Sequence, residues 1–207
     1  MFSHYVSALL AVSGTILLAM KSYQLGDPGF YIAAFLIYGI TVFLMFASSS
    51  TYHQVNVSES KEEIFRLLDH MMIYVVIAGT YTPICAIVLE GEWRVWMLAG
   101  IWGAAIAGVI KKVFWMNAPR WISTILYLIM GWVSVIIVPQ IWNSLPHAFT
   151  WWIITGGLFY TIGAIIYIIE KPDPFPEVFG HHEIWHLFVM GGAFSHFWGI
   201  YQYLPGY

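Results

Sequence analysis

The amino-acid sequence predicts an all-α integral membrane protein, a bundle of seven transmembrane helices that forms one domain over residues 1–207. Three observations support this fold class. Of the 207 residues, 60% are hydrophobic and only 9% are charged, whereas a soluble domain carries about 25% charged residues. The mean hydropathy is +0.74. Seven mostly apolar stretches come close to or exceed the roughly 20 residues that a helix needs to cross a bilayer.

The predicted spans are bounded by charged or turn-forming residues. They cover approximately residues 3–20, 29–52, 64–89, 93–110, 119–142, 149–169 and 182–203. The first span ends before Lys21, the second follows the turn-like residues 26–29, and the third closes at the acidic residues 90–92. Helices are expected because a lipid-embedded backbone has to satisfy its own hydrogen bonds.

The last four spans have similar limits. The fourth ends on Lys111 and Lys112, the fifth opens after residues 117–118, and the sixth ends at residues 170–172. The seventh begins at a histidine pair. Within the fourth span, Gly100, Ala104 and Gly108 recur at every fourth position, a spacing that lets helices approach closely. This pattern predicts a helix-packing stripe.

The basic residues predict the orientation. With seven spans, six of the eight lysines and arginines fall on one side of the membrane and two on the other. The first group is Lys61, Arg66, Lys111, Lys112, Arg120 and Lys171, and the second is Lys21 and Arg94. The positive-inside rule then places the N-terminus in the cytoplasm and the C-terminus outside. The first span lacks a basic start and a small-residue cleavage site, so no cleavable signal peptide is expected.

Charge and composition also bound the partners. The formal net charge is −3 and no run of basic residues occurs. Proteins that bind nucleic acid through their charge carry a basic patch or stripe, so no nucleic-acid partner is expected. The expected partners are membrane lipids.

Five polar residues fall at the predicted cytoplasmic ends of three spans. His182 and His186 are four residues apart, which places them on one helix face, and zinc favours such nitrogen ligands. Ser49 and His53 share the same spacing, and Asp69 lies early in the third span. Ionisable groups at this depth are costly and are functional candidates. We therefore expect these residues to form one site.

Three imidazoles with one open coordination position would make a catalytic zinc site. Asp69 would be a fourth ligand or would hold and deprotonate a zinc-bound water, whose pKa zinc lowers to about 7. Ser49 would orient His53 or polarise a substrate carbonyl. Each residue also has a structural alternative: Ser49 in helix packing, Asp69 paired with Arg66 or His70, and His53 at the membrane interface. The matching depth of all five favours the metal site.

The remaining histidines fit this site less well. His4 lies near the N-terminus, His147 in an outer loop, and His181 before the seventh span, where it is expected to be solvated. His196 follows His186 by ten residues, about 15 Å along a helix. For His196 we expect packing or an interhelical hydrogen bond.

Residues 182–186 also match the zinc-metalloprotease pattern H-E-x-x-H, in which the glutamate, here Glu183, is the general base. The motif is short, and chance matches are common. Asp69 and His53 come from other spans as a rival base and a rival third ligand. The protease interpretation is therefore the weaker one.

Several spaced motifs together resemble a known family over nearly the whole chain. They are Ser49-x3-His53, Asp69 within residues 65–70, the residues 78–83 (Ala-Gly-Thr-Tyr-Thr-Pro), and His182-x3-His186 followed by residues 191–196 (Gly-Gly-Ala-Phe-Ser-His). This set resembles the hemolysin III family, the bacterial branch of the progestin and adipoQ receptor group. Any one motif alone is unspecific, whereas the spaced set is specific.

The resemblance implies seven helices with a cytoplasmic N-terminus, in the bacterial inner membrane. It also implies a zinc ion near the cytoplasmic face, bound by His53, His182 and His186. Asp69 would bind the zinc-bound water, and Ser49 would lie beside it. The implied activity is zinc-dependent hydrolysis of a lipid amide or ester, as in a ceramidase. The alternatives are a pore-forming hemolysin and a non-enzymatic sensor of membrane state with a structural zinc.

Overall fold

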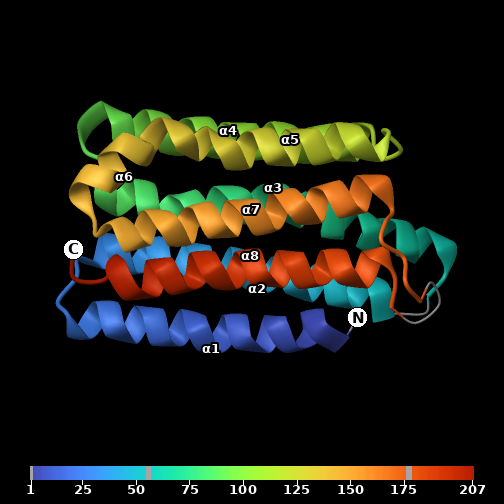
Figure 1. Cartoon of the computed structure of the whole chain (residues 1–207), viewed down its shortest axis with the longest axis horizontal. Coiled ribbons are helices and arrows are strands. Elements are labelled where there is room, and N and C mark those ends of the chain that lie inside the picture. The colour runs from blue at the N-terminus through green and yellow to red at the C-terminus, as the bar shows by residue number, and fades with distance from the viewer. Residues whose placement is uncertain (1, 55–56, 176–178) are drawn as a thin grey trace.

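The structure is a computed structural model that describes residues 2–54, 57–175 and 179–207, and within these residues it is almost wholly helical (Figure 1). The elements are α1 (Phe2–Gln24), α2 (Gly29–Gln54), α3 (Glu59–Val88), α4 (Gly91–Phe114), α5 (Arg120–Trp132), the 3₁₀ helix η1 (Val133–Ile137), α6 (Val138–Ser144), α7 (His147–Ile169) and α8 (His181–Tyr203). The predicted all-α class is confirmed.

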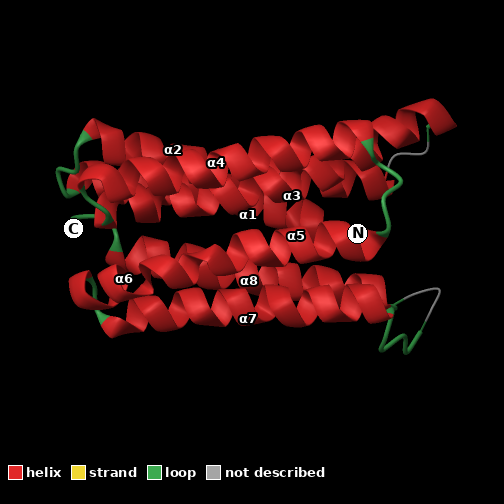
Figure 2. Cartoon of the chain, turned by 90° about the horizontal axis from the view of Figure 1, so that it is seen from above, coloured by secondary structure: helices red, strands yellow, loops and turns green. Residues whose placement is uncertain are grey.

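The long helices lie side by side, and consecutive ones run in opposite directions (Figure 1). In the first group, α2 packs against α1 and α3, and α3 packs against α4. In the second group, α7 packs against α8 and α5 packs against α7. Viewed from above, the two groups form two layers (Figure 2). Contacts of α1 with α8 and of α3 with α5 join the layers.

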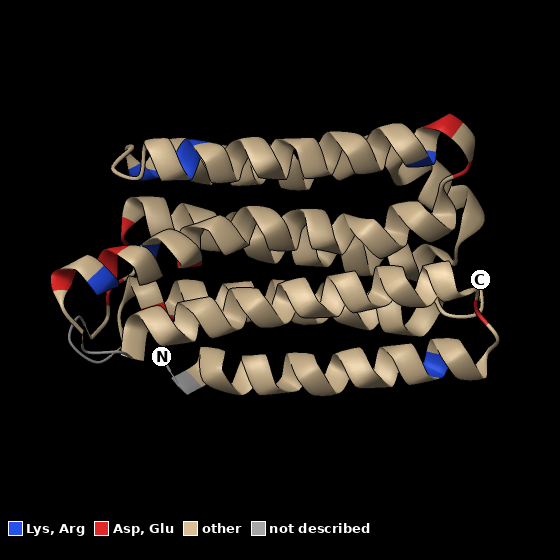
Figure 3. Cartoon of the chain, turned by 180° about the vertical axis from the view of Figure 1, so that it is seen from behind, with Lys and Arg blue, Asp and Glu red and all other residues tan. Residues whose placement is uncertain are grey.

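Among the described residues, six helical rods are long and apolar enough to cross a membrane. They are α1, α2, α3, α4, the composite α5–η1–α6 and α7. The α8 helix is as long as α7, at 23 residues each. It is less apolar than α7 because it carries four of the eight histidines. Charged residues gather at the two ends of the bundle and are scarce along its middle (Figure 3), as an apolar hydrocarbon layer requires.

The predicted fifth span is not one continuous α-helix. Between α5 and α6 the chain narrows into the 3₁₀ helix η1. The cause is Pro139, which has no N–H and whose ring would clash with the carbonyl four residues earlier in an α-helix. The Tyr81 hydroxyl lies 2.8 Å from the carbonyl oxygen of Met130 and 2.7 Å from that of Gly131. It thus provides α3 with a hydrogen-bonding contact to the α5 backbone next to the break.

The third predicted span begins too late. We predicted a start near residue 64, but α3 begins at Glu59. Its first turn carries Glu59 and Glu62, which favour a helix N-terminus through the helix dipole. These charged residues lie outside the apolar stretch, so hydropathy alone excludes them. The extra turn extends the helix past the apolar part of the bundle.

The small residues of α4 face in two directions. A side chain added at Gly108 would collide with the ring of Tyr74, whereas one added at Gly100 or Gly103 would meet no atom within 4 Å. Gly108 belongs to the buried face of α4, together with Ile101. The predicted packing stripe is therefore right for Gly108 and wrong for Gly100, because only Gly108 lies on the buried face.

Candidate metal centre

Three imidazoles from α2 and α8 converge near the end of the bundle that holds the N-terminus. One nitrogen each of His53, His182 and His186 lies within 4.8 Å of the other two. Nε2 of His53 is 3.1 Å from Nε2 of His182. The ring centroids of His182 and His186 are 4.5 Å apart, as their spacing of one helical turn dictates. The predicted meeting of these histidines is confirmed.

The donor set fits a zinc ion. His186 is 1% exposed, and neither of its ring nitrogens has a hydrogen-bond partner among the residues that the structure describes. A buried polar group without a partner is costly, and a metal ion is one of the groups that would satisfy it. Two nitrogens bound to one tetrahedral zinc lie about 3.3 Å apart, given zinc–nitrogen bonds of about 2.0–2.1 Å. The His53–His182 separation is close to that value.

Ser49 has a different partner from the one we expected. Its hydroxyl lies 2.8 Å from Nδ1 of His4, and both residues are 2% exposed. Among the described residues, Ser49 forms no hydrogen bond with His53. The expectation that Ser49 orients His53 therefore finds no support in this geometry. From the sequence, His4 fits the site less well because it lies near the N-terminus. Its helix packs against both α2 and α8, which brings His4 into the site.

Asp69 lies beside the three histidines but outside their group. It is buried, lines the same cavity as His53 and His182, and has Ser49 next to it. Its Oδ2 is 4.0 Å from Nδ1 of His70, which is engaged with the carbonyl oxygen of Arg66 at 2.6 Å. Within the described ranges Asp69 forms no ion pair with Arg66. Of the two structural partners expected for Asp69, His70 thus lies at the limit of ion-pair distance, and Asp69 also lines the cavity.

Glu183 is engaged at the start of α8. Its Oε2 accepts a hydrogen bond of 2.9 Å from the backbone N–H of Gly180, in a capping arrangement typical of a helix N-terminus. This contact ties the glutamate to the helix end. The protease-like placement, in which Glu183 would face a metal-held water, finds no support in this geometry.

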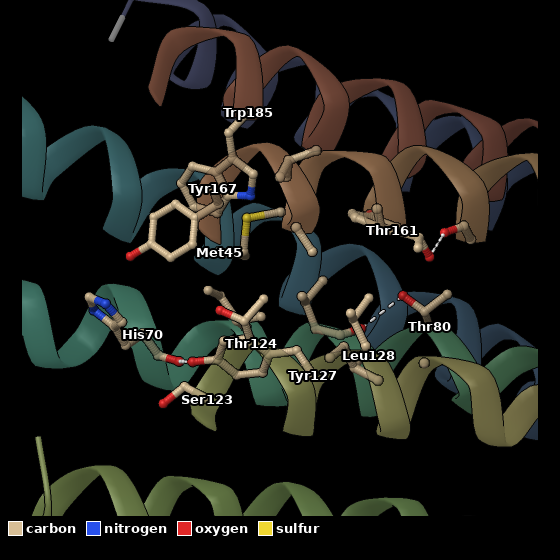
Figure 4. A pocket seen from close by; sticks show the side chains of 18 of the residues that line it. Met45, His70, Thr80, Ser123, Thr124, Tyr127, Leu128, Thr161, Tyr167 and Trp185 are labelled. Atoms are coloured by element: carbon tan, nitrogen blue, oxygen red, sulfur yellow. Dashed lines mark hydrogen bonds between the residues drawn. The ribbon is translucent and has the colours of Figure 1, made fainter. Parts of the chain in front are cut away.

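A cavity of about 1120 Å³ extends from the histidines into the bundle between the two layers. At one end it is lined by His53, Asp69 and His182, and it reaches Thr150 and His196. Figure 4 shows part of the cavity wall, where Leu128, Met45 and Trp185 lie among several threonines.

The threonine hydroxyls of the wall are satisfied by their own helices. Thr80 donates to the carbonyl of Val76 at 2.8 Å, and Thr161 donates to that of Gly157 at 2.7 Å (Figure 4). Such back-bonding uses the polar atom locally. These two hydroxyls therefore offer no free donor to the cavity, whose wall is mostly apolar, whereas the Thr150 hydroxyl at its far end has no hydrogen-bond partner among the described residues.

The other histidines have structural contacts. Nε2 of His196 lies 3.1 Å from the carbonyl oxygen of Ile153, which confirms the expected interhelical hydrogen bond. His181 was expected to be solvated before the helix. Instead it is the first residue of α8, and its Nδ1 is 3.5 Å from Oδ1 of Asp173. The expectation was wrong because the chain before α8 brings this acidic residue back against the helix start.

Comparisons with known proteins match almost the whole chain. The family model described as Haemolysin-III related matches residues 1–197. Hemolysin-3 of Bacillus cereus is 36% identical over 203 residues, which are 98% of this chain and 89% of that protein. The Hemolysin-3 homolog of Bacillus subtilis (strain 168) is 34% identical over 201 residues, 97% of this chain and 91% of that protein. The Monocyte to macrophage differentiation factor of Homo sapiens is 28% identical over 209 residues, 98% of this chain and 82% of that protein. No solved structure matches the chain.

Proposed function

This chain belongs to the haemolysin-III-related family, and we propose that it is a zinc-binding seven-helix membrane protein that hydrolyses an amide or ester bond of a lipid. It is an integral membrane protein, and the bacterial inner membrane fits its relatives and its apolar helices. The observation that carries the proposal is the convergence of three imidazoles at one end of a large, mostly apolar cavity.

The proposal makes α8 the seventh span, although it is not among the six helical rods that are long and apolar enough to be candidate spans. The polar residue His186 of α8 is buried inside the bundle, whereas the large apolar side chains of Leu187 and Phe194 are 48% and 58% exposed. A helix that turns its ionisable groups inward and its apolar groups outward suits a lipid environment. The N-terminus then lies in the cytoplasm and the C-terminus outside, as the six-to-two distribution of basic residues favours.

His53, His182 and His186 would hold the metal. When bound, zinc supplies a Lewis acid that polarises a carbonyl and makes hydroxide available near neutral pH. Three protein ligands leave one coordination position open, which is typical of catalytic rather than structural zinc sites. Two of the ligands come from one helix turn and the third from α2, so the ligand set depends on the packing of the two layers.

Asp69 would act as the general base of the reaction. Its carboxylate lines the cavity near the histidines, where it is placed to orient a water molecule and take its proton. Ser49 lies next to Asp69 and would hold a polar group of the substrate or the same water. These roles use residues from α2 and α3, across the bundle from the paired histidines of α8.

The shape of the cavity supports a lipid substrate. The cavity volume of about 1120 Å³ is slightly larger than that of common small-molecule pockets, which is about 300–1,000 Å³. Its wall is mostly apolar, which suits an acyl chain. The polar groups at one end would receive the amide or ester carbonyl. A pore, in contrast, needs polar side chains along the whole membrane path. Here the charged side chains that line the cavity lie near the histidine end, and they are those of Arg66, Asp69, Lys112, Arg120 and Glu170.

The test of the proposed function is turnover by the purified protein, with its metal content measured in parallel. The substrates are a ceramide-like amide and an ester lipid, and the readout is release of fatty acid. Wild type is expected to release fatty acid, and this release is expected to stop when a chelator removes zinc. His147→Ala, at the other end of the bundle, is expected to behave as wild type. If no such lipid is turned over and zinc removal only lowers the melting temperature, the zinc is structural and the non-enzymatic alternative is the better account.

A further inference from the structure

His4 of α1 is in contact with both helices that supply the candidate metal ligands. Its ring is stacked on that of His186, with centroids 3.8 Å apart and planes inclined by 20°. Its Nδ1 lies 2.8 Å from the Ser49 hydroxyl, one helical turn before His53. The His4 ring also forms a T-shaped contact with the Phe46 ring, with centroids 5.1 Å apart. With 2% exposure, His4 is enclosed by these contacts.

The His186 ring lacks a hydrogen bond to orient it among the described residues, and its contacts with the rings of His53, His182 and Trp185 are edge-on or tilted rather than stacked. A metal-binding histidine is normally held by a hydrogen bond from its second ring nitrogen to a carboxylate, a carbonyl or water, and this bond fixes the plane of the ring. Neither nitrogen of His186 has such a partner in the part of the chain that the structure describes. The flat ring of His4 covers one face of His186 and blocks rotation out of its plane.

We propose that His4 is a positioning residue of the metal centre, which holds the His186 ring in its ligating plane by stacking and fixes the Ser49 hydroxyl by hydrogen bonding. The inference rests on the proposed metal site and not on the hydrolytic activity. His4 is not a ligand in this assignment, because it stands outside the group of three histidines whose nitrogens lie within 4.8 Å of one another.

The two contacts of His4 can be separated by substitution. His4→Phe keeps a flat ring over His186 and loses the contact with Ser49. His4→Asn keeps a polar group for Ser49 and loses the ring, and His4→Ala loses both. Two controls match these changes: Tyr5→Ala removes a half-exposed ring from the same turn of α1, and His147→Ala removes an imidazole stacked on Trp142 at the other end of the bundle, with centroids 3.7 Å apart.

The experiment measures three properties of full-length protein in detergent: zinc per chain at saturating zinc, the rate of zinc loss to a chromophoric chelator, and the visible absorption of the cobalt-substituted protein. We expect His4→Ala and His4→Asn to keep about one zinc per chain but to lose it about tenfold or more faster, within the range for loss of a partner that supports a ligand. Their cobalt bands should shift. His4→Phe and the two controls should remain near wild type in the rate of zinc loss and in the cobalt absorption bands.

Three outcomes would overturn the inference. Wild-type zinc loss and cobalt bands in all His4 variants would show that His4 positions nothing. Failure of folded His4→Ala to bind zinc at saturation, as expected for His186→Ala, would make His4 a ligand. A His4→Phe variant that loses zinc as fast as His4→Ala would remove stacking as the cause. If His4→Ala does not fold, the comparison of His4→Phe with His4→Asn still decides. Absence of zinc from wild type itself would instead defeat the proposed function.

Discussion

Nε2 of His53 and Nε2 of His182 lie 3.1 Å apart, although 129 residues separate them in the chain. One residue is near the end of α2 and the other is in the first turn of α8, so the two layers of the bundle meet at this pair. Two neutral imidazoles at this distance can share only one proton between them. A zinc ion would use both nitrogens at once, which makes the pair sensitive to metal.

The first prediction concerns metal content. Wild type is expected to hold about one zinc per chain, and His53→Ala and His186→Ala are expected to lose most of it, because each removes one of three converging ligands. Elemental analysis of purified protein measures this directly. His147→Ala is the matched control, since its imidazole lies at the far end of the bundle. A wild-type preparation without zinc would contradict the prediction.

The second prediction separates the two carboxylates near the histidines. Asp69→Asn is expected to remain folded and to retain zinc, and its turnover should fall by about 10²–10⁴-fold, as for loss of a general base. Glu183→Gln is expected to keep its turnover, because glutamine can accept the same hydrogen bond from Gly180. Its stability should change by less than about 1 kcal/mol. Fatty-acid release and zinc content are measured on the same samples. The opposite pattern, with Glu183 essential and Asp69 dispensable, would favour the metalloprotease-like arrangement.

The third prediction concerns membrane orientation. A reporter fused after Tyr207 is expected to report an external C-terminus, because α8 is proposed as the seventh span and the basic residues concentrate at the N-terminal end of the bundle. A fusion in the loop between α2 and α3 serves as the cytoplasmic control. Cytoplasmic signals from both fusions would mean that α8 does not cross. An external signal from the loop together with a cytoplasmic signal from the C-terminus would mean that the bundle is inverted.

The fourth prediction uses two glycines of the same helix. Gly108→Ala is expected to destabilise the protein by about 1–3 kcal/mol, because the new methyl group would overpack against the buried Tyr74 ring. Gly103→Ala meets open space and should be neutral or stabilising, since alanine is the better helix former by up to about 1 kcal/mol. Thermal unfolding in detergent compares the two variants. Equal losses at both positions would argue against the observed rotation of α4.

Hydropathy and helical spacing alone were sufficient to predict the fold class and part of the candidate site. The all-α class and the approximate positions of the helices followed from long apolar stretches, because hydrophobicity along a chain is a local property that lipid selects directly. The pairing of His182 with His186 also followed from a local rule, the four-residue turn of a helix. The common depth of His53 and Asp69 followed from the alternation of the spans across the membrane.

Only the tertiary structure determined which helices are neighbours in the bundle and which of their side chains are in contact. Alternating spans determine the depth of a residue but not which way its helix is rotated or which helix is its neighbour. For this reason the sequence did not reveal that His4 stacks on His186, that Ser49 contacts His4 rather than His53, or that Glu183 is held at the helix start. The same rotation turns Gly108 toward Tyr74 and Gly103 outward. Lateral packing is set by side-chain contacts between distant segments, and these leave no periodic signal in the sequence.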